Sequence, residues 1–192
     1  MNISSQGGEG GDASAVRPIC LTGYMGAGKT SVGRLLAAKI SRNFLDLDAE
    51  IQLRAGKTIR QIFQEHGDSG FRDVERQSLA ALLQGSDPSV IALGGGTLQD
   101  ETNRNALHAA NAFLIHLEAP VGELWRRCTD GFNAEEIAKR PLLAEGEAAF
   151  KERSASREAN YRSAQVSITT TGLSVEEVAQ ACQNAISAIL QH

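Results

Sequence analysis

The sequence of 192 residues is poor in cysteine and in aromatic residues, and it has no surplus of positive charge. Its 3 cysteines, Cys20, Cys128 and Cys182, are odd in number and lack metal-site spacing, so we expect reduced packing residues and neither disulfides nor a zinc site. Since 19 Lys and Arg face 23 Asp and Glu, we expect no nucleic-acid partner. The length and a 42% share of hydrophobic residues are enough for one globular domain with its own core.

The sequence also lacks any apolar run of the roughly 18 residues that a membrane helix needs. Residues 1–16 have neither the basic start nor the apolar middle of a secretion signal, so we expect a cytoplasmic protein without a membrane partner. The same segment holds four glycines and three serines and almost no large apolar side chains. It predicts a disordered N-terminal tail, followed by a single domain over residues 17–192.

Short apolar runs alternate with helical patterns along residues 17–192. Helical patterns follow Lys29, the capping-box spacing of Thr58 and Gln61, and a similar cap at Ser174. Strands separated by helices in this way specify an α/β fold, a mostly parallel sheet covered on both faces. The expected strands lie at Ile19–Leu21, Phe44–Asp48, Val90–Leu93, Phe113–Leu117 and Val166–Thr170.

Residues 129–146 are polar, with two glycines, one proline and no clean apolar stripe. This composition indicates a mobile surface segment. Arg140 lies in it and could meet a transferring phosphate if the segment closes over a bound nucleotide. Without closure, Arg140 would be a solvated loop cation.

Residues Gly23–Thr30 match the pattern G-x-x-x-x-G-K-[ST] between an expected strand and an expected helix. Glycines let the backbone N–H groups turn toward phosphate oxygens, and the helix dipole adds positive charge. Lys29 would neutralise the outer phosphates, and the Thr30 hydroxyl would ligate Mg²⁺. The loop therefore predicts binding of a nucleoside triphosphate, although motors, switches and small-molecule kinases all use it. The predicted nucleotide-binding residues here are Gly26, Ala27, Gly28, Lys29, Thr30 and Ser31.

Other polar clusters bear on the group that accepts the phosphate. Asp46 and Asp48 are two residues apart at the end of an expected strand, so both carboxylates should project to one side. One acid could hold the magnesium shell and the other could take a proton from a hydroxyl. Alone, the pair could equally be solvated strand-end acids. Gly94–Gly96 end another strand, where bare backbone allows a ring-shaped ligand to approach closely.

Two arginines carry planar guanidinium groups that suit a carboxylate. Arg72 begins a helix, and Arg157 lies on the helix that follows the polar segment. A guanidinium forms two parallel hydrogen bonds with a carboxylate. Each arginine alone is more often a surface ion-pair residue than a ligand.

Taken in order, these motifs resemble the shikimate kinase family, over residues 19 to about 190. The resemblance implies a P-loop kinase fold, a three-layer α/β/α arrangement around a five-stranded parallel sheet, with a mobile lid at about 129–146. It implies an enzyme that transfers the γ-phosphoryl group of ATP to the 3-hydroxyl of shikimate with Mg²⁺ as cofactor, on the way to chorismate and the aromatic amino acids. We expect the protein to be a monomer. The motifs are Gly23–Thr30, Asp46 with Asp48, Phe71-Arg72 with Glu75, Gly94–Gly96, Arg140–Leu143, and Arg157 with Tyr161.

The same resemblance implies roles for individual residues. Nucleotide and metal would be held by Lys29 at the β- and γ-phosphates, by Arg127 at the adenine, by Thr30 and Asp46 in the magnesium shell, and by Arg140 through the lid. Shikimate would be held by Asp48 at its hydroxyls, where a base is needed, by Arg72 and Arg157 at its carboxylate, and by Gly94, Gly95 and Gly96 along its ring.

Two features depart from the family pattern. The stretch between Arg127 and Arg140 is longer than usual, with residues 130–138 as an insertion. The strand Val90–Leu93 carries no acid of the second nucleotide-binding motif, so Asp46 would do that work.

Two other functions remain open at this point. A gluconate-type kinase shares the loop and a carboxylate-bearing polyol acceptor, but it does not account for the acid pair together with the glycine triplet. A non-catalytic ATP-sensing module would require Asp48 or Arg140 to be dispensable.

Overall fold

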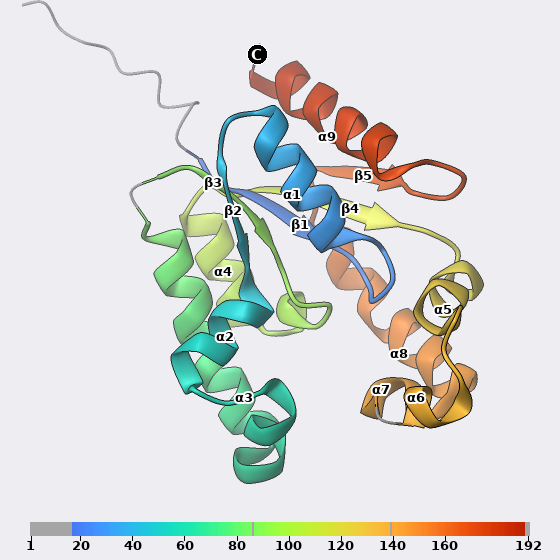
Figure 1. Cartoon of the computed structure of the whole chain (residues 1–192). Coiled ribbons are helices and arrows are strands. Elements are labelled where there is room, and N and C mark those ends of the chain that lie inside the picture. Colours follow the sequence, from blue (N-terminus) through green and yellow to red (C-terminus); the bar gives the residue numbers. More distant parts are fainter. Residues whose placement is uncertain (1–16, 86, 139, 191–192) are drawn as a thin grey trace, which may run out of the picture.

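Five parallel strands form one sheet in the order β2-β3-β1-β4-β5 (Figure 1). The computed structural model describes residues 17–85, 87–138 and 140–190, so the expected tail at 1–16 lies outside the described residues. The parallel five-stranded sheet is confirmed. Its strands are β1 (Ile19–Thr22), β2 (Asn43–Asp46), β3 (Ser89–Ala92), β4 (Phe113–Glu118) and β5 (Val166–Thr169).

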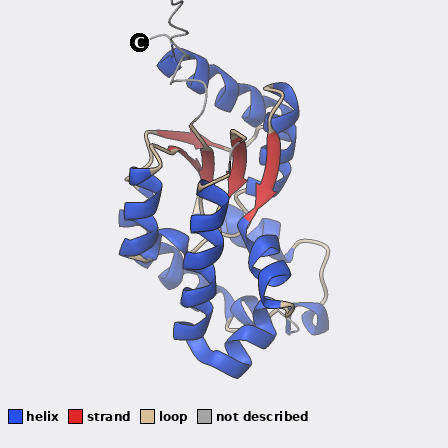
Figure 2. Ribbon diagram, turned by 90° about the vertical axis from the view of Figure 1, so that its left-hand side faces the viewer, coloured by secondary structure: helices blue, strands red, loops and turns tan. Residues whose placement is uncertain are grey.

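Helices cover both faces of the sheet (Figures 1 and 2). Helix α1 (Lys29–Lys39) packs against α9 (Val175–Leu190) on one face. The opposite face carries the second half of α3 (Ile59–Leu83), α4 (Glu101–Ala109) and α8 (Gly146–Tyr161). The remaining helices follow strand ends or lie in the polar segment: α2 (Leu47–Ala55), the 3-10 turn η1 (Thr97–Gln99), α5 (Val121–Thr129), α6 (Ala134–Ala138) and α7 (Pro141–Ala144).

The core lies on both sides of the central strands. Every residue of β1 and β3 is buried, which explains why these strands are short apolar runs without alternation. Cys20 and Cys182 are buried and Cys128 is half-buried, and all three thiols are free, as expected. Near the C-terminal edge of the sheet, Phe150 packs edge-on against Tyr24 and Trp125.

The acid pair does not lie on one strand, and that expectation was wrong. Strand β2 ends at Asp46, which becomes the N-cap of α2 and accepts hydrogen bonds from the backbone N–H groups of Asp48 and Ala49 at 3.1 and 3.4 Å. Aspartate is a strong N-cap because its carboxylate satisfies N–H groups that have no partner within the helix. Asp48 therefore reaches the site from the first turn of a helix that the sequence pattern had not indicated.

The two capping boxes are confirmed. Thr58 and Gln61 bond each other reciprocally at the start of α3, and Ser174 and Glu177 do the same before α9. Gly67 is a break within α3, with φ 65° and ψ −167°. The chain turns there and resumes as a helix, so α3 consists of two helical parts joined end to end.

The polar segment 129–146 contains two short helices, α6 and α7, that its sequence did not predict. Leu143 is 3% exposed, and the carbonyl of Leu142 accepts a hydrogen bond from Arg153 of α8 at 3.3 Å. The segment is thus anchored to α8 near its end, and its mobility stays a prediction. None of the helices in the described ranges combines the length and apolar character needed to cross a bilayer.

Candidate active site

The glycine-rich loop joins β1 to α1 along a path that only glycine fits at two points. Gly23 has φ 143°, and a Cβ atom there would lie 2.4 Å from the carbonyl oxygen of Leu117. Gly26 has φ 85°, and a Cβ atom there would lie 2.7 Å from the carbonyl oxygen of Leu124 and 2.9 Å from the Sγ of Cys128. The loop therefore lies against the ends of β4 and α5, and its curvature is fixed by this contact.

The last two side chains of the loop, Lys29 and Thr30, make hydrogen bonds in the ligand-free structure. The Nζ of Lys29 donates to the carbonyl oxygens of Gly23 and Tyr24 at 2.9 and 3.2 Å. Burial lowers the pKa of Lys29, while the nearby charges of Asp48 and Asp46 act in the opposite direction. The Thr30 hydroxyl donates to Asp46 Oδ2 at 2.9 Å. Lys29, the expected phosphate-binding cation, thus lies near Thr30 and Asp46, the two expected magnesium ligands.

Asp48 lies beside the glycine triplet. The residue is exposed, and its Oδ1 lies 3.0 Å from where a Cβ of Gly94 would be. Burial is the main cause that raises the pKa of Asp48, followed by the charge of Asp46 and opposed by Lys29. The carboxyl group therefore holds a proton more tightly than an ordinary aspartate does.

Arg72 is held by a buried carboxylate. Its NH1 contacts Oε2 of Glu75 at 2.7 Å, and the Glu75 side chain is 2% exposed. The Thr97 hydroxyl donates to Glu75 Oε1 at 2.9 Å, and Asn103 Nδ2 donates to Oε2 at 3.5 Å. A buried charge needs such partners, so this network fixes the guanidinium of Arg72. Thr97 and Asn103 could not be predicted from the sequence, since each is a single polar residue with no motif around it.

Arg157 reaches the same place from α8. Its NH1 lies 3.4 Å from where a Cβ of Gly95 would be, and its NH2 lies 3.5 Å from the corresponding point on Gly96. Arg72 NH2 lies 3.3 Å from that point on Gly96. Two guanidinium groups thus flank one glycine, and Asp48 lies at the other end of the triplet. The structure brings together all the residues that the sequence analysis assigned to the acceptor.

A cavity of about 440 Å³ is lined by the loop residues Gly26–Gly28 and by Ser31. Arg127 lines it and is held by Glu123 at 2.8 Å and by the hydroxyl and carbonyl of Thr170 at 2.8 and 3.0 Å. The same guanidinium is 3.5 Å from the carbonyl oxygen of Gly26. Thr170 and the following Gly172 and Leu173 were missed, although their place after the last strand of a parallel sheet is where ligands gather.

Arg140 lies apart from the loop. It is exposed, and its guanidinium carbon lies 3.9 Å from the centre of the Phe132 ring within the polar segment. Cys128 lies beside Gly26, and burial raises the pKa of its thiol. The positive charge of Arg140 acts in the opposite direction and lowers this pKa. The structure therefore does not bring Arg140 into contact with the other expected site residues.

The oxygen donors fit a magnesium ion. Within the described ranges, no group of three or more His, Cys, Asp or Glu side chains could hold a metal by itself. Thr30 and Asp46 supply one hydroxyl and one carboxylate 2.9 Å apart. Magnesium commonly takes few protein oxygens and completes its shell with phosphates and water. The donor set suits a metal that arrives with a nucleotide.

Together, the parallel sheet with a phosphate loop after its central strand, the hydroxyl–carboxylate pair and the second acid define a P-loop kinase. A family model for shikimate kinase matches residues 25–187. A shikimate kinase from Nitrobacter winogradskyi is 40% identical over 172 residues, which are 88% of this chain and 77% of that relative. The structure of a shikimate kinase from Acinetobacter baumannii, in complex with shikimate, is 33% identical with a TM-score of 0.81, over 91% of this chain and 95% of that chain. The chain belongs to the shikimate kinase family.

A gluconokinase from Sinorhizobium meliloti is 15% identical, with a TM-score of 0.57, over 92% of this chain and 95% of that chain. This likeness shows the shared fold alone. It does not favour the gluconate-type function.

Replacing Asp46 with asparagine should lower the pKa of Asp48 toward the ordinary value of 3.8, because a charge that raises it is removed. Asparagine caps a helix about as well as aspartate, so α2 should stay intact. The pKa can be followed through the ¹³C shift of the Asp48 carboxyl carbon in a pH titration of the ligand-free protein. In the unaltered protein, a raised pKa means that the Asp48 charge is lost at a higher pH than for an ordinary aspartate.

The matched control is Asp87→Asn, which removes an exposed acid that precedes β3, at the edge of the sheet away from the glycine triplet, and should leave the pKa of Asp48 unchanged. An equal or higher pKa of Asp48 in Asp46→Asn would show that the two carboxylates do not interact as described.

Proposed function

We propose that this protein transfers the γ-phosphoryl group of ATP to the 3-hydroxyl of shikimate, the reaction named for its family, in the biosynthesis of aromatic amino acids. The observation that carries the proposal is the convergence of Arg72, Arg157 and Asp48 on the glycine triplet, next to the phosphate loop. An acid and two fixed cations around bare backbone fit a ring that bears hydroxyls and one carboxylate. All of these residues come from one chain, so we propose that a monomer suffices.

ATP would bind with its phosphates in the loop and its base in the cavity beside Arg127 and Thr170. The N–H groups of Gly26–Ser31 and the N-terminal end of α1 favour negative charge there. Lys29 would exchange its loop carbonyls for oxygens of the β- and γ-phosphates. Thr30 and Asp46 would hold Mg²⁺, which supplies positive charge to the phosphates when it is bound.

Shikimate would lie along Gly94–Gly96 with its carboxylate between Arg72 and Arg157. Its hydroxyl oxygen would form a new bond to the γ-phosphorus, and the bond from that phosphorus to the oxygen of ADP would break. Asp48 would accept the hydroxyl proton, and its raised pKa makes it a better proton acceptor than an ordinary aspartate.

The segment 129–146 would act as a lid on a single domain. Arg140 lies at the start of α7, whereas the end of this segment is anchored to α8 through Leu142 and Arg153. Closure would move Arg140 from the ring of Phe132 toward the phosphates.

The function can be tested by measuring ADP release in the presence of ATP and Mg²⁺. The acceptor is shikimate in one assay, gluconate in a second, and is left out of a third. We expect release with shikimate only. Release with gluconate only would favour the gluconate-type function, and binding of ATP without release under any condition would favour a non-catalytic module.

The substitution Asp48→Asn should preserve ATP binding and lower turnover by about 10² to 10⁴, because an amide cannot accept the hydroxyl proton. Steady-state turnover and calorimetric ATP binding measure the two effects. Asp87→Asn serves again as the control and should turn over normally. Near-normal turnover of Asp48→Asn would remove Asp48 from the role of base.

The substitution Arg72→Lys should raise the KM for shikimate about tenfold and the KM for ATP little, since lysine keeps the charge but loses the planar fork. Arg76→Lys is the matched control one turn along α3, because Arg76 pairs with Asp73 and Asp100. Equal increases in both KM values would place Arg72 outside the acceptor pocket.

The substitution Arg140→Ala should lower turnover by up to about 10³ and change ATP affinity little, because the contact would form mainly in the closed complex. Arg162→Ala removes an exposed arginine of the same chain and should have no effect. Protease cleavage within 129–146 should slow when an ATP analogue and shikimate are present. Unchanged cleavage together with full activity of Arg140→Ala would show that this segment is a passive loop.

A further inference from the structure

A tyrosine hydroxyl joins α8 to the glycine triplet. Tyr161 is the last residue of α8 and is 5% exposed. Its hydroxyl donates to the carbonyl oxygen of Gly95 at 2.7 Å, across 66 positions of sequence. This distance is typical of a well-formed hydrogen bond with a hydroxyl donor.

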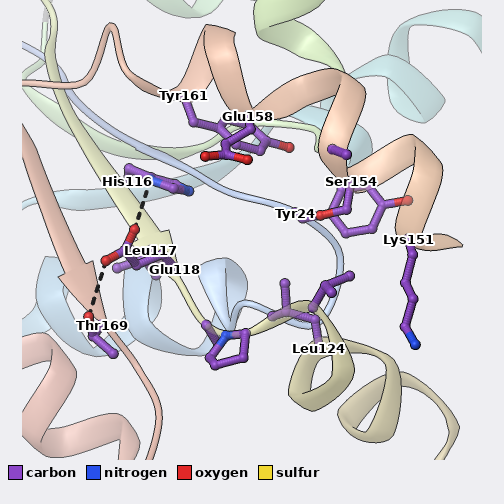
Figure 3. Close-up of a pocket in the computed structure, with 14 residues that line it drawn as sticks. Tyr24, His116, Leu117, Glu118, Leu124, Lys151, Ser154, Glu158, Tyr161 and Thr169 are labelled. Carbon is purple, nitrogen blue, oxygen red and sulfur yellow. Dashed lines mark hydrogen bonds and ion pairs between the residues drawn. The ribbon is translucent and has the colours of Figure 1, made fainter.

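The ring of Tyr161 packs against strand β4. It stacks on His116 of β4, with ring centres 4.8 Å apart and planes at 21°. His116 lies 3.4 Å from the Ser167 hydroxyl and 3.8 Å from Glu118 Oε2. Tyr161 and His116, with Tyr24 of the phosphate loop, line a cleft of about 520 Å³. Figure 3 shows these side chains. The hydroxyl is therefore held in place by packing against the sheet.

Gly95, the middle residue of the glycine triplet, lies next to both helix α8 and the phosphate loop. A Cβ atom on it would lie 3.4 Å from NH1 of Arg157, 3.6 Å from the carbonyl oxygen of Gly23 and 3.8 Å from the backbone nitrogen of Met25. Helix α8 and the phosphate loop thus both adjoin this glycine. A shift of the Gly95 peptide would alter the distance between the glycine triplet and the phosphates of a bound nucleotide.

The hydrogen bond also sets the direction of a backbone N–H group. The carbonyl of Gly95 and the N–H of Gly96 belong to one planar trans peptide and point in opposite directions. With the carbonyl fixed on Tyr161, the N–H of Gly96 points away from the tyrosine. Glycines have no side chain to hold them, so this bond supplies an orientation that the triplet lacks by itself.

We propose that Tyr161 is a positioning residue for the acceptor: its hydroxyl orients the Gly95–Gly96 peptide so that the triplet, Arg72 and Arg157 form one fixed surface for a carboxylate-bearing polyol. The inference rests on the proposed function, in which the triplet lines the acceptor. Burial raises the pKa of Tyr161 to about 12, so the hydroxyl keeps the proton that it donates at neutral pH.

The substitution Tyr161→Phe removes the hydroxyl and keeps the ring on His116. We expect the KM for shikimate to rise about 3- to 10-fold, as for loss of one hydrogen bond, with the KM for ATP and the melting temperature little changed. The control Ser154→Ala removes a hydroxyl from the same helix and the same cleft and should change neither KM. Backbone amide resonances of ¹⁵N-glycine-labelled protein give a second readout: Gly96 should shift in Tyr161→Phe and not in Ser154→Ala.

An unchanged KM for shikimate with an unmoved Gly96 resonance would overturn the inference and leave the proposed function standing. Equal rises in both KM values with a large fall in melting temperature would also overturn it, because that result describes a purely structural residue. If the unaltered protein releases no ADP with shikimate, the proposed function fails, and this inference fails with it.

Discussion

The parallel pairing of β1 with β3 determines where the functional segments lie. The ladder extends beyond the strands, where the N–H of Leu93 donates to the carbonyl oxygen of Leu21 at 2.9 Å. Because both strands run in the same direction, they stop at the same edge, and the phosphate loop and the glycine triplet start side by side. The close approach of Gly95 to Gly23 follows from this register. A shift of one residue would move one loop relative to the other and would also turn the buried side chains to the opposite face.

A second constraint is the buried charge of Glu75. A carboxylate removed from water is stable only when cations and hydrogen-bond donors surround it, and removing one partner leaves it uncompensated. Its partners come from α3, η1 and α4, so the network joins three elements beside the glycine triplet. The ion pair with Glu75, whose side chain is almost fully buried, gives Arg72 a fixed orientation. We therefore expect the proposed acceptor site to be rigid on this wall, whereas Arg140 is exposed.

Much of this arrangement could be predicted from local sequence signals, and the remainder depends on contacts between distant residues. The five strands, the loop and the capping boxes each have a short pattern with a clear physical cause. Helix α2 was missed because the alternation of Phe44–Asp48 continues into a first helical turn, where Asp46 changes from strand residue to cap. Thr97 and Asn103 were missed because only the burial of Glu75, 22 and 28 positions away, gives them a role.

The position of Asp48 between groups of opposite charge has a consequence for the proposed reaction. Asp46 raises the pKa of Asp48 and Lys29 lowers it. When Lys29 turns toward phosphate oxygens, part of its charge is compensated, so Asp48 would hold a proton more tightly. Coordination of Asp46 to Mg²⁺ has the opposite effect, because the negative charge that raises the pKa is then shared with the cation. Binding of nucleotide and binding of metal would therefore act on the proton affinity of Asp48 in opposite directions. The proton affinity of the proposed base thus depends on Lys29 and Asp46, the same side chains that are proposed to hold the phosphates and the metal.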